Sequence, residues 1–485
     1  MPESSLKNKT IKGVGWSAVD NVAKVGVAFV VGIILARLLT PDDYGLIGIL
    51  TIFISVFNAI VDSGFTNALI RKQQTENVDY CTAFYTNLCF SFFLAGTLFL
   101  CAHPIATFFD RAELVAMTQV MSSIVIINAF AIVQKARLTK KIDFKTQAKI
   151  TFTASALSGI IGIVMAYIGF GVWSLVVQQI TEKFLTTLFL WYFNRWFPSF
   201  IFSWKSFKEM WSFGWKLLAS SLISTIWNEI YQVVIGKCYS SQTLGLYTRA
   251  MQFSSLFSNN FTSVIQRVSF PVLSSIQDDK ERLRFAYRRV IRNTMFPTFI
   301  FMFGMAACSK SMILALIGEQ WCGCIIFLQL ICFTAMLYPL HAINLNMLKV
   351  QGRSDIYLKL EIIKKIIGIG PLLLGVFVSV YSMLIGSIFT NFICYFFNAY
   401  YSGPFVNYRI KEQVMDIIPS FSVAVVMASL VFCMSFLPIT AYILFPLQII
   451  VGAIITFFIC EKTKLPEYLE LKGIVMPQLM KIVKK

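Results

Sequence analysis

Several charged side chains lie well inside long apolar segments of this chain, where charge is expensive and therefore informative. A charge at the centre of a membrane helix costs about 2.5–3.5 kcal/mol on insertion scales, so such residues usually face a polar interior or a water-filled path. Buried cations suit an anionic substrate, particularly a phosphate or pyrophosphate. The cations concerned are Lys24, Lys183, Arg249, Arg267 and Lys364, and the acids, which are candidates for ion coupling, are Asp20, Asp62 and Glu229.

The spacing of these residues separates two interpretations. Asp20/Lys24, Gln179/Lys183 and Glu361/Lys365 are each four apart, so each pair shares one helix face and is open to a purely structural, self-neutralising role. Lys364, Arg249 and Arg267 have no acid four positions away on their own face, and a ligand anion is a more natural partner for them. Arg267 alternatively reaches the membrane surface as a snorkelling side chain.

The whole composition places these residues in a membrane protein. The 485 residues are 57% hydrophobic and 14% charged, which is too little polar surface for a soluble protein, and the mean hydropathy is +0.71. Segments of about 20 apolar residues can cross the bilayer as helices, and we count about fourteen. Their approximate ranges are 14–38, 45–70, 80–109, 112–134, 147–170, 171–193, 211–237, 244–272, 292–317, 322–348, 356–380, 383–402, 414–437 and 440–460.

Lysine and arginine fall mainly into alternate gaps between these segments. The gaps around Lys140 and Arg288 are strongly basic, whereas the opposite gaps hold few cations, such as Arg37 and Lys237. The positive-inside rule therefore predicts a cytoplasmic location for both termini. The net charge of +18 is mostly this topology signal, and no single basic domain indicates nucleic-acid binding.

Two similar segments lie about two hundred residues apart. Residues 35–46 (LARLLTPDDYGL) align without a gap on residues 235–246 (IGKCYSSQTLGL), so that Arg37 matches Lys237 and Gly45 matches Gly245. This match aligns the first apolar segment with the seventh, and both segments are expected to cross the membrane in the same direction. The chain is therefore expected to contain two six-helix lobes as parallel repeats.

No catalytic or cofactor-binding pattern is present. The nucleotide-binding, zinc-protease and serine-hydrolase motifs are absent, and the chain has only two histidines, His103 and His341. The eleven cysteines, including Cys322 and Cys324, lack a second pair at metal spacing, so they are expected to be buried free thiols. His341 with Asn344 and Asn346 is more typical of interhelical hydrogen bonding than of a proton relay. We therefore expect no enzyme activity, no catalytic residues, no metal and no cofactor.

Six short segments resemble the polysaccharide transporter branch of the MOP (multidrug, oligosaccharidyl-lipid, polysaccharide) exporter superfamily, whose members include Wzx-like oligosaccharide flippases. They occur in the family order and are 13–16 (GVGW), 35–45 (LARLLTPDDYG), 62–65 (DSGF), 68–72 (ALIRK), 244–247 (LGLY) and 270–279 (FPVLSSIQDD).

The resemblance implies an all-α integral membrane protein with two six-helix lobes and two further helices, MATE-like, around a central cavity. The corresponding domains are residues 1–194, an interfacial linker at 195–209, residues 210–402, and residues 403–485 with a basic tail. It also implies alternating access that moves an undecaprenyl-pyrophosphate-linked oligosaccharide to the outer leaflet of a bacterial inner membrane, for lipopolysaccharide, capsule or exopolysaccharide assembly. Lys24, Arg249 and Lys364 are the positions that could match the family's pyrophosphate-binding cations.

The expected partners are the lipid-linked oligosaccharide and membrane lipids, together with a glycan polymerase and glycosyltransferases as candidates. A multidrug secondary exporter is the alternative function, because it would share the architecture. Such an exporter should favour unpaired acids in its cleft, whereas the intramembrane surplus here is basic.

Overall fold

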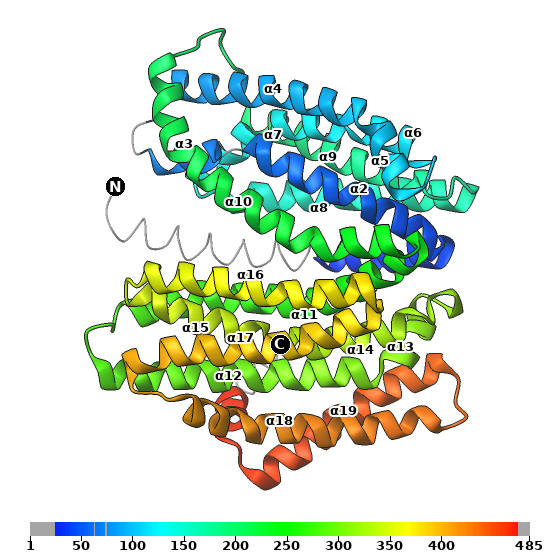
Figure 1. Cartoon of the computed structure of the whole chain (residues 1–485), viewed down its shortest axis with the longest axis vertical. Helices are drawn as coiled ribbons and strands as arrows, with labels where there is room; N and C mark the ends of the chain where they lie inside the picture. The colour runs from blue at the N-terminus through cyan, green and yellow to red at the C-terminus, as the bar shows by residue number, and fades with distance from the viewer. Residues whose placement is uncertain (1–24, 63, 73–74, 474–485) are drawn as a thin grey trace, which may run out of the picture. The chain divides into compact units, whose positions relative to one another are not determined.

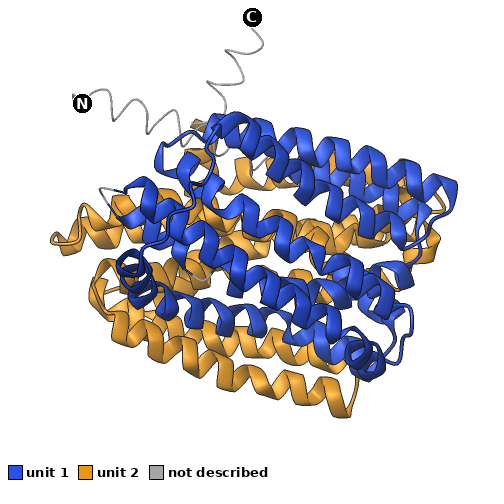
Figure 2. Ribbon diagram, turned by 90° about the horizontal axis from the view of Figure 1, so that it is seen from above, with its two compact units in different colours: residues 1–248 blue, residues 249–485 orange. Residues whose placement is uncertain are grey.

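The computed structural model describes residues 25–62, 64–72 and 75–473, and these residues are almost entirely helical, with no strand among them (Figure 1). They divide into two compact units, residues 1–248 and 249–485 (Figure 2). The predicted all-α membrane fold is confirmed.

The first unit contains the helix Val25–Leu38 and nine further helices. These are α2 (Pro41–Asp62), α3 (Phe65–Arg71), α4 (Asn77–Leu100), α5 (Ala102–Phe109), α6 (Leu114–Met121), α7 (Ser123–Lys140), α8 (Phe144–Ile168), α9 (Trp173–Asn194) and α10 (Trp204–Cys238). α8 packs against α9, and α10 packs along α2. α11 (Ser241–Ser274) begins in this unit and continues into the second.

The second unit is built from the rest of α11 and eight further α-helices. These are α12 (Lys280–Ala307), α13 (Ser309–Leu316), α14 (Cys324–Ala335), α15 (Tyr338–Val350), α16 (Ser354–Phe377), α17 (Val380–Ser402), α18 (Ile410–Cys433) and α19 (Ala441–Thr463). α12 packs against α14 and α18, and α16 packs against α17. A short helix over residues 466–473 follows α19.

Local signals in the sequence explain several of the helix boundaries. The side chains of Asp143, Ser203 and Ser379 accept hydrogen bonds from the backbone N–H groups that would otherwise be unpaired at the starts of α8, α10 and α17. α8 ends at Gly169, whose φ of 95° is a left-handed conformation that glycine adopts readily.

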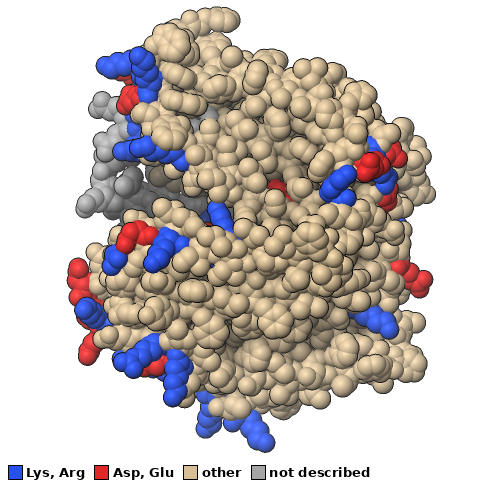
Figure 3. Space-filling view, viewed as in Figure 1, with Lys and Arg blue, Asp and Glu red and all other residues tan. Residues whose placement is uncertain are grey.

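Nine helical stretches of the described residues are long and apolar enough to cross a membrane. The other predicted segments are not among these nine stretches. One contains the helix Val25–Leu38, which is shorter, and the rest lie on α9, α10, α11 and α16. The multi-pass architecture is therefore clear, while the exact number of fourteen crossings stays a prediction. On the face in Figure 3, charged side chains gather toward the helix ends and only a few coloured atoms lie between them.

The two similar segments predicted from the sequence contact each other directly within the first unit. A Cβ atom added to Gly45 would lie 1.8 Å from the Ser241 carbonyl oxygen, and one added to Gly245 would lie 1.7 Å from the Pro41 carbonyl oxygen. Beside this contact, Arg111 donates to both carboxylate oxygens of Asp42 at 2.6 and 2.9 Å and to the Ser241 hydroxyl at 2.5 Å. The starts of α2 and α11 are thus joined by equivalent backbone contacts and a shared ion pair.

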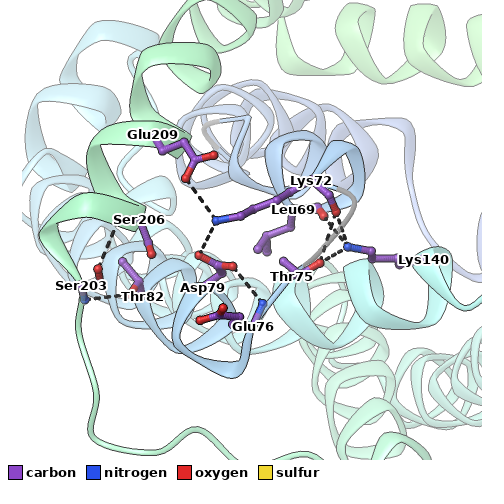
Figure 4. A network of polar contacts seen from close by, with 10 residues as sticks. All are labelled: Leu69, Lys72, Thr75, Glu76, Asp79, Thr82, Lys140, Ser203, Ser206 and Glu209. Carbon is purple, nitrogen blue, oxygen red and sulfur yellow. Dashed lines mark hydrogen bonds and ion pairs between the residues drawn. The ribbon is translucent and has the colours of Figure 1, made fainter.

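A polar network fixes the other end of the first unit (Figure 4). Lys72 donates to Asp79 of α4 at 3.0 Å and to Glu209 of α10 at 3.1 Å. Burial opposes a charge on Lys72, but these two hydrogen bonds outweigh it and raise the pKa of the Lys72 ammonium above its ordinary value. Lys140 of α7 donates to the Leu69 carbonyl at 3.4 Å and to Thr75. The network therefore ties α3, α4, α7 and the start of α10 together.

A short linker joins α9 and α10. Only residues 195–203 are non-helical, because α10 begins at Trp204 and continues for 35 residues. Phe200 in this linker is 98% exposed and Phe197 is 70% exposed, which is typical of aromatic side chains at a membrane interface. The domain boundaries predicted at 194, 209 and 402 stay predictions.

Candidate functional site

Asp20 and Lys24 lie outside the described residues. The other six predicted site residues are placed on five helices of the two units: Asp62 on α2, Lys183 on α9, Glu229 on α10, Arg249 and Arg267 on α11, and Lys364 on α16.

Arg249 is a buried cation. It is only 5% exposed, and its Nη1 donates to Oε1 of Gln252 at 2.8 Å. Its guanidinium carbon also lies 5.1 Å from the ring centroid of Phe253, a distance suited to a cation–π interaction. These two contacts come from the next turn of α11, so local neighbours help to orient the guanidinium group.

Arg267 occupies a different level of the same helix. Eighteen residues separate it from Arg249, which corresponds to roughly 27 Å along a helix at 1.5 Å per residue. Its side chain is exposed, in contrast to that of Arg249. The two arginines therefore do not belong to one site, and the snorkelling interpretation suits Arg267.

The predicted pairing of charges on α16 is wrong in one respect. Glu361 forms its ion pair with Lys364, at i,i+3, and not with Lys365 at i,i+4. Both spacings bring side chains onto one helix face, so the four-residue criterion alone missed the acid that accompanies Lys364. Lys364 is consequently a paired cation, with 21% of its side chain exposed.

Lys364 belongs to a polar region inside the second unit. It lies close enough to His341 of α15 and Cys394 of α17 to act on both electrostatically. The ring Nδ1 of His341 is hydrogen-bonded to Asn398 Nδ2 of α17 at 2.8 Å. The prediction that His341 contributes interhelical hydrogen bonding is therefore confirmed.

A second set of buried hydrogen bonds extends this region. Tyr287 of α12 donates to Oδ1 of Asn344 at 2.6 Å, and the Ser402 hydroxyl donates to the same oxygen at 2.8 Å. Asn344 was singled out from the sequence, whereas Tyr287, Asn398 and Ser402 were not. An asparagine late in an apolar segment is the signal that could have identified Asn398, because a buried amide needs partners.

The candidate residues of the first unit are more dispersed. Glu229 is hydrogen-bonded to Gln232 on the next turn of α10. Asp62 is the last residue of α2, exposed, and accepts a hydrogen bond from Thr66 at 2.5 Å. Lys183 is half-buried on α9, where the neighbouring Glu182 accepts from Ser155 of α8 at 3.5 Å.

The predicted intramembrane charges are concentrated on particular helices. Lys183, Glu229, Arg249, Arg267 and Lys364 all lie on α9, α10, α11 or α16, the long helices that are not in the strongly apolar group. A helix that faces lipid on every side would not tolerate this composition. These charges are therefore expected to face a polar environment and not the lipid.

The described part of the chain contains no metal-binding cluster and no disulfide bond. Within that part, no group of three His, Cys, Asp or Glu side chains could hold a metal ion. All eleven cysteines are free, as predicted, although Cys89, Cys238, Cys322 and Cys433 are exposed and not buried.

The profile of the polysaccharide biosynthesis protein family matches residues 34–326, more than half of the chain. The succinoglycan biosynthesis transport protein ExoT of Rhizobium meliloti is 27% identical over 65% of this chain, and the aligned part spans 64% of ExoT. The lipopolysaccharide biosynthesis protein WzxC of Escherichia coli is 23% identical over 76% of each chain.

Two solved structures share the fold. The lipid II flippase MurJ in an inward closed conformation has a TM-score of 0.72 at 14% identity, covering 92% of this chain and 97% of its own. An inward-facing multidrug resistance MATE transporter of the MOP superfamily has a TM-score of 0.60 at 16% identity, covering 84% of this chain and 98% of its own. The chain therefore has the MOP superfamily fold and belongs to the polysaccharide biosynthesis protein family.

Proposed function

We propose that this protein is a flippase that moves an undecaprenyl-pyrophosphate-linked oligosaccharide from the inner to the outer leaflet of a bacterial cytoplasmic membrane. The observation that carries the proposal is membership of the polysaccharide biosynthesis family, together with relatives named as polysaccharide and lipopolysaccharide transport or biosynthesis proteins. The MATE likeness supports the fold alone and does not favour drug export.

Transfer of such a substrate across the membrane is consistent with the arrangement of charge along the chain. A sugar head group cannot cross hydrocarbon, whereas a polyprenyl tail can stay in the lipid. The cations on the polar helices α9, α10, α11 and α16 would balance the charge of the pyrophosphate. Lys24 and Lys183 remain candidates for the same role, with Arg267 as the least suited because of its exposed position.

Arg249 and Lys364 are the cations best suited to bind the pyrophosphate. Gln252 and Phe253 orient the guanidinium group of Arg249, and a planar fork of donors matches phosphate oxygens. Glu361 forms an ion pair with Lys364. A bound pyrophosphate would compete with Glu361 for the Lys364 ammonium group. This competition would weaken pyrophosphate binding and allow its release.

Membrane orientation and partners complete the proposal. The alternating distribution of lysine and arginine supports cytoplasmic termini in an inner membrane. A glycan polymerase and glycosyltransferases would act on the same lipid-linked substrate before or after transfer. Asp20, Asp62 and Glu229 are the candidates for coupling transfer to an ion gradient, because acids inside or at the ends of membrane helices can exchange protons or sodium ions.

Binding of the substrate class tests the proposal. Purified protein in detergent would be titrated with an undecaprenyl-pyrophosphate-linked oligosaccharide, comparing wild type with Arg249→Ala and Arg249→Lys. Loss of a charge-assisted hydrogen bond should weaken binding roughly tenfold in Arg249→Ala, with a smaller loss in Arg249→Lys.

Lys237→Ala provides the matched control. Lys237 is also a cation and lies twelve residues before Arg249, but it is in the last turn of α10 and pairs with Asp110 at 3.3 Å. It should bind the substrate as wild type does, and thermal unfolding should show that every variant is folded. Equal weakening in Lys237→Ala and Arg249→Ala, or no detectable binding by the wild type, would contradict the proposal.

A further inference from the structure

A small cavity of about 180 Å³ lies in the second unit, between the N-terminal part of α12 and the helix at residues 466–473. Five of its lining residues occupy one face of α12 at helical spacing: Phe285, Arg288, Arg289, Arg292 and Asn293. The helix after α19 contributes Glu467 and Glu470. Three guanidinium groups and two carboxylates therefore line one cavity.

Each arginine is held in place by a carboxylate that is itself hydrogen-bonded to another donor. Arg288 forms a bidentate pair with Asp416, which also accepts from Tyr408 at 2.6 Å. Arg289 Nε donates to Glu470 at 2.8 Å, and Asn293 donates to the same oxygen at 2.7 Å. The arginines are thus oriented before any ligand arrives, which lowers the entropic cost of binding.

The third arginine has the most buried partner. Arg292 Nη2 donates to Oε2 of Glu467 at 2.9 Å, and Ser420 donates to Oε1 of the same carboxylate at 2.7 Å. The Glu467 side chain is only 1% exposed, so this pair anchors the helix at 466–473 to α12. The anchor keeps the two walls of the cavity together.

Much of the donor capacity of these arginines is unused. Within the described residues, the acids occupy Nε and Nη2 of Arg288, Nε of Arg289 and Nη2 of Arg292, and no contact uses Nη1 of any of the three. Arg288 and Arg289 keep 44% and 54% of their side chains exposed. Guanidinium groups that line one cavity and keep unused N–H donors are suited to bind phosphate oxygens.

The surroundings of the cavity favour a lipid as the source of that phosphate. Residues 280–307 form one of the candidate membrane spans, and the cavity lies in its first half. Phe285 at the cavity is 67% exposed, an arrangement suited to contact with lipid. Basic residues near a membrane surface attract anionic lipids by about 1 kcal/mol each.

We propose that this cavity binds a phosphate group, and that its source is the head group of an anionic phospholipid in the leaflet that meets the start of α12. The site consists of Arg288, Arg289 and Arg292, and Asn293, whose Nδ2 donates to Glu470, lines the cavity beside them. It is separate from the proposed substrate-binding cations, because all its residues lie on α12 and the helix after α19, which carry none of those cations.

Arg289 and Glu470 are the positions at which to test the site. Their exposed pair contributes little to stability, so Arg289→Ala should fold. Replacement of Arg292 would instead leave the Glu467 carboxylate buried without its cation. Arg282→Ala is the matched control, since Arg282 is an exposed cation on the same helix that does not line the cavity.

Native mass spectrometry of the full-length protein with equal amounts of phosphatidylglycerol and phosphatidylethanolamine would measure lipid retention. Wild type should retain phosphatidylglycerol preferentially, Arg289→Ala should retain roughly fivefold less, and Glu470→Gln, which removes an opposing charge, should retain more. Arg282→Ala should match wild type. An equal loss in Arg282→Ala, or unchanged retention in Arg289→Ala, would overturn the proposal.

Inorganic phosphate distinguishes the two sources of the ligand. If the source is a lipid, millimolar phosphate should not raise the melting temperature of lipid-depleted wild type, while added phosphatidylglycerol should. A rise with inorganic phosphate in wild type but not in Arg289→Ala, without lipid preference, would support the phosphate site and assign it to a soluble ligand. No response of wild type to either ligand would overturn the proposal.

Discussion

Gly45 and Gly245 occupy matching positions in the two similar segments, and the backbone of each segment lies against the glycine of the other. The starts of α2 and α11 approach each other so closely there that no side chain has room at either position. This relationship gives physical meaning to a sequence match that spacing alone could only suggest.

Replacement of either glycine by alanine should therefore destabilise the protein. The added Cβ would lie less than 2 Å from a backbone carbonyl oxygen, so the helices must move apart, at a cost of about 2 kcal/mol or more. Gly96→Ala is the control, because Gly96 lies within α4 with nothing within 4 Å of an added Cβ. Thermal unfolding in detergent should show lower stability for Gly45→Ala and Gly245→Ala only, and a tolerated Gly45→Ala would disprove this packing.

Removal of the Lys72 ammonium group should loosen the other end of the first unit. Lys72→Met leaves Asp79, whose side chain is 4% exposed, without its cation, and we expect a loss of roughly 2 kcal/mol. Lys141→Met is the control, since Lys141 is exposed and forms none of these contacts. If chemical denaturation detects no difference between the two variants, the network is not stabilising.

The same lysine predicts a pH dependence. Because its pKa is raised in the folded protein, its contribution should be complete below its unfolded pKa, about 10.4, and should disappear as the pH rises through the folded pKa. The stability difference between wild type and Lys72→Met should thus be constant near neutral pH and shrink in strongly alkaline buffer. A difference that grows with pH would contradict this assignment.

The hydrogen bond between His341 and Asn398 should appear as coupling between two mutations. Interhelical hydrogen bonds in membrane proteins average about 0.6 kcal/mol, so His341→Ala and Asn398→Ala should each destabilise, with a double mutant less unstable than the sum by about that amount. Strictly additive losses of stability would show that the contact between α15 and α17 has no energetic weight.

Lys364 and Lys365 provide a paired test of the proposed pyrophosphate binding by Lys364. They are neighbours with the same charge, but only Lys364 pairs with Glu361 and lies near His341. Lys364→Ala should lower transport severalfold, Lys364→Arg should retain more of it, and Lys365→Ala should have little effect. Transport in reconstituted vesicles is the readout, and a larger loss in Lys365→Ala than in Lys364→Ala would reverse the assignment.

The sequence predicted the fold more completely than the site. Long apolar runs identify helices because crossing the bilayer requires them, and the match of Gly45 with Gly245 identified two segments that contact each other in the structure. Side-chain pairing depends on rotamers and on neighbours from distant helices. The spacing in the sequence therefore could not predict that Glu361 pairs with Lys364 and not with Lys365. Partners such as Asn398 for His341 come from another helix and carry no local signal.

Transfer of the lipid-linked oligosaccharide across a bilayer would show directly whether this protein is a flippase. Proteoliposomes with a labelled undecaprenyl-pyrophosphate-linked oligosaccharide would be assayed for its appearance in the opposite leaflet. We predict transfer by wild type and by Lys237→Ala, and transfer roughly tenfold slower by Arg249→Ala at limiting substrate, because a buried phosphate-binding cation is lost. Transfer by wild type no faster than in protein-free liposomes would contradict the proposed flippase function.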